Sequence, residues 1–306
     1  MASAMQGNGG ADAAVAIAAR ERRRPKARET GATVTAVAPA TLYVSALLVL
    51  PFLMLVYLSF HQADPVTGYK EGLTLQNYAK LIASPVYVDS MIGTARLALV
   101  VTLCSLVLGY PVAWFLARSR SHFVPLATAI VVVPLFVSVV VRSFGWIVLL
   151  GREGTLNAVL LALGLTGEPI QFLYTEGAVT AGLVHILIPL MILPLASVLR
   201  GIDSALEDAA RSLGASGAKA FWTVIFPLSL PGVGAGSVLV FSHVIAAFVL
   251  PALIGSERVK LVATMIYQQV MVIGDVPLGA ALGAVMVIAT FALIVVARMF
   301  SRRLGT

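Results

Sequence analysis

The chain has 306 residues, of which 59% are hydrophobic and 11% are charged, and its formal net charge is +7. Soluble domains carry about 25% charged residues, so this composition excludes an ordinary soluble protein. Most of the surface must face something other than water. The Lys and Arg residues fall into groups between long apolar stretches, which argues against a nucleic-acid partner.

The first 35 residues are predicted to form a disordered basic tail in the cytoplasm. An apolar AAVAIAA run precedes the basic cluster of this tail, whereas a cleaved signal peptide has the reverse order. The cluster consists of Arg20, Arg22, Arg23, Arg24, Lys26 and Arg28.

Six apolar stretches follow, each long enough to cross a hydrocarbon core about 30 Å thick. Only Arg96 and Arg142 place a charge inside them, and internal prolines are tolerable where neighbouring helices satisfy the freed carbonyls. An all-α membrane protein is therefore expected, with a six-span domain over 36–303 and a C-terminal end at 304–306. The predicted spans are 36–60, 91–117, 123–150, 177–199, 226–254 and 276–297.

The basic residues also predict the orientation of these spans. They are concentrated in the tail, in the 2–3 and 4–5 connections and at the C-terminus. By the positive-inside rule, both termini and the 4–5 connection lie in the cytoplasm. The chain is expected to be a multi-pass membrane protein. In the fifth span, Gly232, Gly234 and Gly236 predict close approach by another helix.

The 4–5 connection, residues 200–226, is polar and patterned as a helix. Ser204 and Glu207 match the S-x-x-E capping box, which predicts a helix that starts at Ser204. Gly214 stands where a helix end favours a residue without Cβ strain. Between these signals lies an apolar face with the spacing i, i+3, i+4 and i+7, made of Leu206, Ala209, Ala210 and Leu213.

A second helical pattern begins after this glycine, with Ser216 as its cap and Pro227 near the start of the fifth span. Its apolar residues are Ala218, Phe221, Trp222 and Ile225. The connection is thus predicted to be two short surface helices joined by a glycine bend. Two interpretations compete: a hairpin that rests on lipid headgroups, and an element that inserts into a groove of a partner protein. The acids of the first helix favour the partner protein, because an anionic leaflet would repel them.

The connection resembles the cytoplasmic loop signature of ABC importer permeases, E-A-A-x-x-x-G followed after nine residues by I-x-L-P. Here it reads Asp208-Ala209-Ala210, then Gly214, then Val224-Ile225-Phe226-Pro227. Asp replaces Glu, Val replaces Ile and Phe replaces Leu. The resemblance implies a type I ABC importer permease of a bacterial inner (plasma) membrane, in which this loop is a coupling helix that docks into a cytoplasmic ATP-binding subunit.

The resemblance also implies the partners. They are two ATPase subunits that bind ATP and magnesium, a second and non-identical permease that completes a heterodimer, and an external solute-binding protein. The chain itself has no G-x-x-x-x-G-K-[ST] pattern and no His/Cys/acid cluster, so neither catalysis nor a bound cofactor or metal is expected. The residues implied for ATPase coupling are Glu207, Asp208, Ala209, Ala210, Leu213, Gly214, Ala215, Phe221 and Pro227.

Residues 139–175 and 274–283 resemble one branch of these permeases, the spermidine/putrescine type. That branch also handles iron, opine-like and aminophosphonate solutes. Two solute classes therefore remain open: a polyamine or related small amine, and an anionic or zwitterionic solute. A polycation favours carboxylates and aromatic faces, yet acids occur only at the outer ends of the spans, as Glu153, Glu168, Glu176, Glu257 and Asp275.

Five residues within the spans are candidates for the solute path or its gate. Arg142 either meets an anionic solute or snorkels to a helix end. Phe144 and Trp146 either narrow a gate or belong to the interfacial aromatic belt. His185 and His243 are functional candidates, or neutral imidazoles bonded to backbone carbonyls. An ion-coupled secondary transporter would need acids deep in the spans, and a membrane scaffold would transport nothing.

Overall fold

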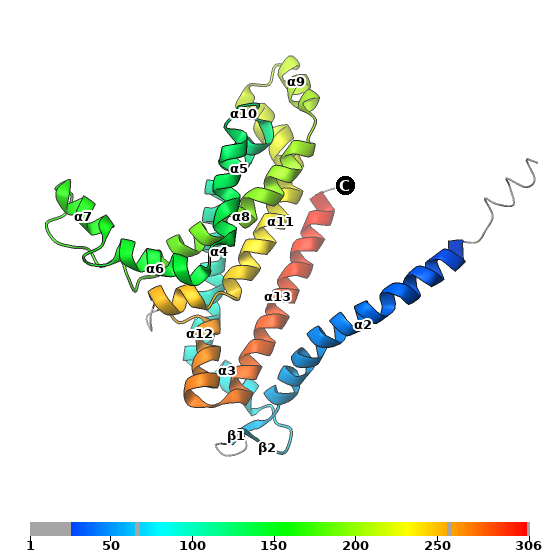
Figure 1. The fold of residues 1–306 in the computed structure, drawn as a ribbon, viewed down its shortest axis with the longest axis vertical. Helices are drawn as coiled ribbons and strands as arrows, with labels where there is room; N and C mark the ends of the chain where they lie inside the picture. Colours follow the sequence, from blue (N-terminus) through cyan, green and yellow to red (C-terminus); the bar gives the residue numbers. More distant parts are fainter. Residues whose placement is uncertain (1–25, 65–67, 256–258, 305–306) are drawn as a thin grey trace, which may run out of the picture. The chain divides into compact units, whose positions relative to one another are not determined.

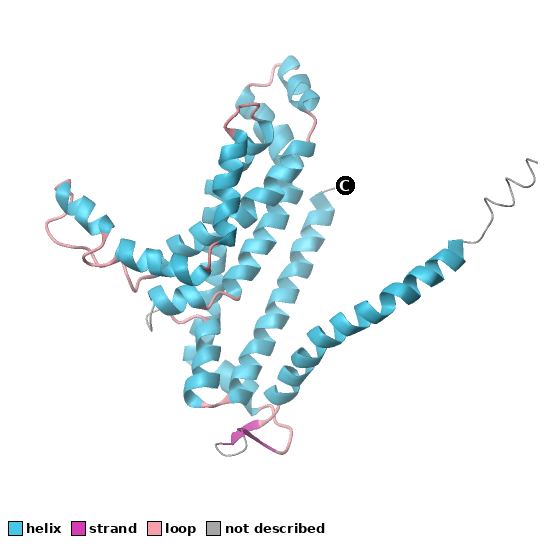
Figure 2. Cartoon of the chain, in the orientation of Figure 1, coloured by secondary structure: helices cyan, strands magenta, loops and turns pink. Residues whose placement is uncertain are grey.

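The computed structural model describes residues 26–64, 68–255 and 259–304. These residues are mostly helical, with one two-stranded sheet (Figures 1 and 2). The chain divides into two units, Met1–Met54 and Leu55–Thr306. Helix α2 (Lys26–Ser59) starts inside the expected tail. The rest of the tail, residues 1–25, lies outside the described residues.

Within the described residues, five helical stretches are long and apolar enough to cross a membrane, which confirms the all-α membrane fold. Three shorter apolar helical stretches accompany them, Val124–Phe136, Val262–Ile273 and Val276–Ala292. The last of these opens α13 (Val276–Leu304), where the sixth span was expected. The five long stretches are Ala38–Ser59, Pro85–Arg118, Val139–Ala162, Glu176–Gly201 and Gly217–Ile245.

Three helices of the second unit form its core: α4 (Pro85–Arg118), α8 (Glu176–Gly201) and α11 (Phe226–Ile245). Small residues allow α11 to approach α8 closely. A Cβ atom at Gly236 would lie 2.7 Å from the Met191 sulfur, which leaves no room for a side chain. Gly232 is similarly close to α8, so the predicted helix contact is confirmed.

The third span, predicted as one helix over 123–150, is broken. Helix α5 (Val124–Val132) passes into a 3₁₀ turn, Val133–Phe136, and α6 (Val139–Leu150) follows an extended residue. Pro134 lies in the turn, where its ring removes a backbone donor. Prolines also occur inside α8 without breaking it. That helix is packed on several sides, whereas α5 has a single buried residue and little to hold it straight.

The fifth span lies earlier in the chain than predicted, because its helical stretch covers Gly217–Ile245 and α11 does not continue to residue 254. A π turn, Pro251–Gly255, comes after the break. Helix α12 (Val262–Tyr267) and a π turn, Gln268–Ile273, then lead to α13.

The two ends of the second unit differ in structure (Figure 1). Helices α9 (Ser204–Ser212) and α10 (Gly217–Ala220) lie at one end. Strands β1 (Gln62–Asp64) and β2 (Gly68–Lys70), which pair antiparallel, lie at the other end with α3 (Gln76–Ala83). The 4–5 connection is thus a separate, exposed feature of one end of the helical body.

Candidate functional site

Helix α9 starts at Ser204, but Asp203 is its cap. The Asp203 Oδ1 atom accepts a hydrogen bond from the Ala205 N–H at 2.9 Å. The predicted capping box, with Ser204 as the cap, is therefore wrong, because the cap is Asp203, one residue earlier. Glu207 instead pairs with Arg211 one turn later, with 2.7 Å between Oε1 and Nη2. The i,i+4 pair supports the short helix.

The predicted glycine bend is confirmed at Gly214, whose φ is +86°. The Ala215 N–H donates to the Ala210 carbonyl at 3.0 Å and the Gly214 N–H donates to the Arg211 carbonyl at 2.9 Å. This is the Schellman pattern, which satisfies the last carbonyls of a helix. After the bend, Ser216 Oγ accepts from the Lys219 N–H at 3.3 Å and caps α10 as expected.

The second of the two predicted short helices is not separate from the fifth span. Helix α10 passes through a π turn, Phe221–Ile225, directly into α11. The Phe226 N–H bonds to the Phe221 carbonyl five residues back. Because the wider turn accommodates Pro227, which lacks an N–H, the helix continues. Movement of α10 must therefore move the start of α11.

The apolar face of α9 is uncovered by the described part of the chain. Helix α9 has no buried residue, and Leu213 is 89% exposed and Leu206 47% exposed. Asp208 and Ala209 are also exposed beside them. An amphipathic helix of this kind suits insertion into a groove of another protein.

Phe221 faces the body of the chain, although the resemblance implied a coupling contact for it. Its ring centroid lies 5.5 Å from that of Tyr110 and 5.7 Å from that of Trp114, both on α4. The Tyr110 hydroxyl bonds to Ser229 Oγ on α11 at 2.9 Å. Sequence reasoning missed Tyr110, Trp114 and Ser229. The aromatic pair in YPVAW at the end of the second span was the only signal.

Two of the five path candidates, from different spans, are brought into contact. Trp146 Nε1 on α6 donates to His185 Nδ1 on α8 at 3.3 Å, and the rings meet edge to face. His185 therefore bonds a side chain and not the backbone carbonyl of the simpler interpretation. His243 fits that interpretation, since its Nδ1 lies 2.9 Å from the Leu239 carbonyl.

Arg142 and Phe144 lie on the same helix as Trp146 but have different surroundings. The Nε and Nη1 atoms of Arg142 are buried and have no hydrogen-bond partner among the described residues. Phe144 is 55% exposed. Residues 26–64, 68–255 and 259–304 contain no group of three or more His, Cys, Asp or Glu side chains that could hold a metal ion.

A groove of about 810 Å³ runs between α4 and α8 and includes His185. The ion pair of Arg96 with Glu176, 3.4 Å from Nη2 to Oε2, also lines it. The sequence predicted Glu176 at the outer end of a span and Arg96 inside a span, and it did not predict their pairing, because the two residues are 80 positions apart. Of the five predicted path residues, His185 lines this groove.

Known proteins resemble the chain over most of its length. Residues 105–306 match the family described as binding-protein-dependent transport system inner membrane component. The spermidine/putrescine transport system permease protein PotB of Escherichia coli (strain K12) is 39% identical over 232 residues, which cover 76% of this chain and 84% of that protein. The protein of the same name from Haemophilus influenzae is 34% identical over 76% of this chain and 81% of its own length.

A solved structure supports the fold. A chain from the crystal structure of a bacterial ABC transporter involved in the import of the acidic polysaccharide alginate superposes with a TM-score of 0.72 at 17% identity. The match covers 93% of this chain and all of that one. The helices are thus arranged as in a type I ABC importer permease. The chain belongs to the family of inner membrane components of binding-protein-dependent transport systems.

Proposed function

We propose that the chain is a translocation subunit of an ATP-driven importer of a polyamine such as spermidine or putrescine. The observation that carries this function is the uncovered apolar face of α9, at one end of a membrane-helix body. The similarity to spermidine/putrescine permeases supports the solute class. Helix α9 and both termini would then lie in the cytoplasm.

The proposed assembly has two ATP-binding subunits, which hold ATP and magnesium, and a second, non-identical permease. An external binding protein delivers the solute. Leu206, Ala209 and Leu213 would enter a groove of one ATP-binding subunit, with Asp208 at its rim. Only ATP hydrolysis by the partners supplies energy, and this chain supplies the path.

The local structure supports a route for the motion. Closure of the ATP-binding subunits would displace α9, and the continuous α10–α11 helix would carry that displacement to the fifth span. Phe221 would transmit it to α4, because its ring packs against Tyr110 and Trp114. Two of the three core helices would thus move with the loop and reorient around the path.

A second candidate solute class, anionic or zwitterionic, is favoured by Arg142. Its buried Nε and Nη1 atoms lack partners in the described chain, and buried donors are costly to leave unpaired. An anionic group of a passing solute could satisfy them.

Reconstitution of the complete complex in proteoliposomes tests both candidates. We expect spermidine-loaded binding protein to stimulate ATP hydrolysis, and labelled spermidine to accumulate only when ATP is present. Equal spermidine uptake with and without ATP would support an ion-coupled carrier instead. ATP-dependent uptake of an anion or zwitterion, with none of spermidine or putrescine, would favour the Arg142 candidate.

A further inference from the structure

A second hollow lies beside the outer end of the groove between α4 and α8. Its volume is about 390 Å³, and it is lined by Asp89, Arg96, Tyr174, Glu176 and Lys260 among others. Glu176 begins α8 and α9 follows the end of that helix, so the 26 residues of α8 separate the hollow from the coupling loop by about 39 Å. If the loop is cytoplasmic, this hollow opens toward the side from which solute arrives.

One face of α4 forms the floor of this outer pocket. Asp89, Gly93 and Arg96 follow at i, i+4 and i+7 and so share that face. The glycine keeps the floor open, because the nearest atom to a Cβ placed there would be the Lys260 carbonyl oxygen at 3.9 Å. Ser90 Oγ and Thr94 Oγ1 bond to Lys260 and Val262 across the chain, which fixes the opposite wall.

Tyr174 adds an aromatic side chain to the lining of the pocket, which also includes Glu176. Tyr174 has a φ of +66°, uncommon for a bulky residue. Its N–H donates to the Ile254 carbonyl at 2.9 Å, and it precedes the Thr175 cap of α8 by one residue. This bond fixes the backbone of Tyr174, which comes two residues before Glu176 in the chain. Carboxylates beside an aromatic face are the groups that recognise an organic ammonium.

The cations of the pocket decide whether an ammonium can bind there. Arg96 and Lys260 balance Asp89 and Glu176, so the empty pocket has no formal net charge. However, Arg96 and Glu176 form their ion pair with exposed side chains, 69% and 46% respectively. Exposed pairs hold their partners weakly. Asp89 has no ion pair within the described residues. A competing cation can therefore replace Arg96 on Glu176 at little cost.

We infer that this pocket is an entry site for an organic ammonium, and that Arg96 is a resident cation which the solute displaces from Glu176. Asp89 takes a second ammonium of the same solute. The pocket and the 810 Å³ groove share Arg96 and Glu176 as lining residues. Separation of this ion pair by the solute would therefore connect the pocket to the groove that leads toward His185. The inference rests on the proposed polyamine function and names the residues that would meet the solute first.

Neutral variants separate this role from a structural ion pair. Glu176→Gln should lower the initial rate of spermidine uptake about tenfold, the effect of losing a charged hydrogen-bond partner. Stimulation of ATP hydrolysis by loaded binding protein should persist, because the coupling loop is intact. Arg96→Gln should keep or raise uptake. A structural pair predicts the opposite: equal losses in both variants, restored by the double exchange of Arg96→Glu with Glu176→Arg.

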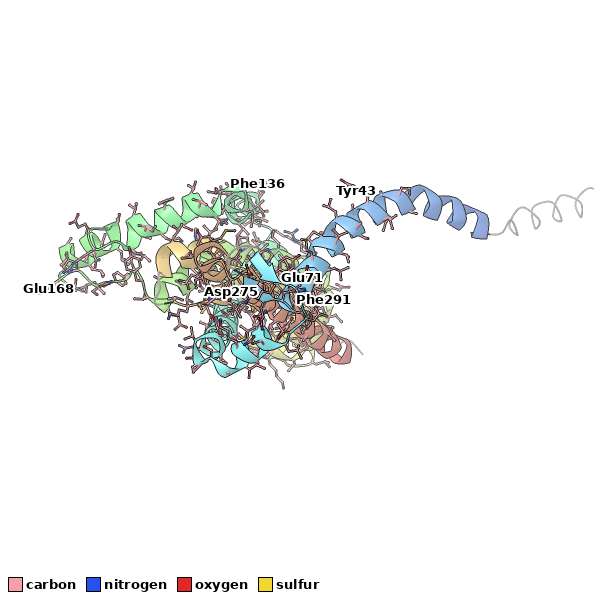
Figure 3. The ribbon with its side chains drawn as sticks, turned by 90° about the horizontal axis from the view of Figure 1, so that it is seen from below. Tyr43, Glu71, Phe136, Glu168, Asp275 and Phe291 are labelled. Atoms are coloured by element: carbon pink, nitrogen blue, oxygen red, sulfur yellow. The ribbon has the colours of Figure 1, made fainter. Side chains whose placement is uncertain are left out.

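Glu168→Gln is the matched control, since Glu168 follows α7 (Thr155–Ala162) at the end of an arm (Figure 3) and is not among the residues that line the pocket. If the unaltered complex imports no polyamine, the proposed function is wrong, and the proposed entry site is wrong as well. If the unaltered complex imports spermidine and the initial uptake rate of Glu176→Gln equals that of Glu168→Gln, only the entry site is wrong. Retained ATPase stimulation reports that each variant is folded and assembled.

Discussion

The direction of α9 depends on the left-handed turn at Gly214, and this dependence can be tested with a mild and a severe substitution at that position. Gly214→Ala should lower the free energy of unfolding by about 1–2 kcal/mol, the penalty for an L-residue in the left-handed region. No steric clash adds to this penalty, because no atom lies within 4 Å of the new Cβ. Gly214→Pro should cost about 3 kcal/mol or more. Proline cannot adopt a φ of +86°, and it removes the N–H that bonds to the Arg211 carbonyl.

The two variants should therefore differ in coupling and not in membrane insertion. We expect Gly214→Ala to raise modestly the number of ATP molecules hydrolysed per solute imported. Gly214→Pro should abolish uptake while basal hydrolysis and complex assembly persist. Gly201→Ala is the control, since Gly201 also has open space at its Cβ but no positive φ. Normal uptake by Gly214→Pro would refute the role of the turn.

Three further substitutions test other parts of the account. Phe221→Ala should remove the contact with Tyr110, cost about 2 kcal/mol because the ring is only half-buried, and lower uptake more than ATP hydrolysis in the reconstituted complex. Gly236→Leu should force α11 away from Met191, costing about 1–3 kcal/mol and lowering the thermal unfolding midpoint in detergent. Asp208→Lys should abolish the stimulation of ATP hydrolysis by loaded binding protein, measured by phosphate release.

Each of these has a comparison that separates the specific effect from general damage. Gly145→Ala should leave the unfolding midpoint unchanged, because no atom lies near its Cβ. The uptake rate of Phe221→Leu should lie between those of Phe221→Ala and the unaltered chain if packing of the Phe221 side chain transmits the motion. Ser212→Lys adds the same positive residue to α9 as Asp208→Lys without removing an acid. Equal loss of stimulation in those two variants would contradict a specific role for Asp208.

The sequence predicted what depends on local pattern. Apolar length gave the membrane helices, and the bend at Gly214 followed from the need for a residue without Cβ strain. The close approach at Gly232 and Gly236 followed from small-residue spacing. The cap of α9 was misplaced because Asp203 and Ser204 are both good caps, and only the backbone conformation decides between them.

What depends on distant contacts could not be predicted. Pro134 lies at a helix break and Pro189 inside a continuous helix, and the difference arises from how many neighbours pack around each helix. The bond between Trp146 and His185 joins two spans, and the contact of Phe221 with α4 joins a loop to a helix more than 100 residues earlier. Periodicity carries no information on such pairs.

The central claim is that α9 lies in the cytoplasm and is gripped by a separate ATP-binding subunit. Leu213→Cys places a thiol at the most exposed position of its apolar face, in a background where Cys104, the only native cysteine, is replaced by Ala. A membrane-impermeant maleimide should label this thiol in inside-out vesicles only, and far less once the ATP-binding subunits are bound. Labelling from the outer side, or equal labelling with and without those subunits, would contradict the account.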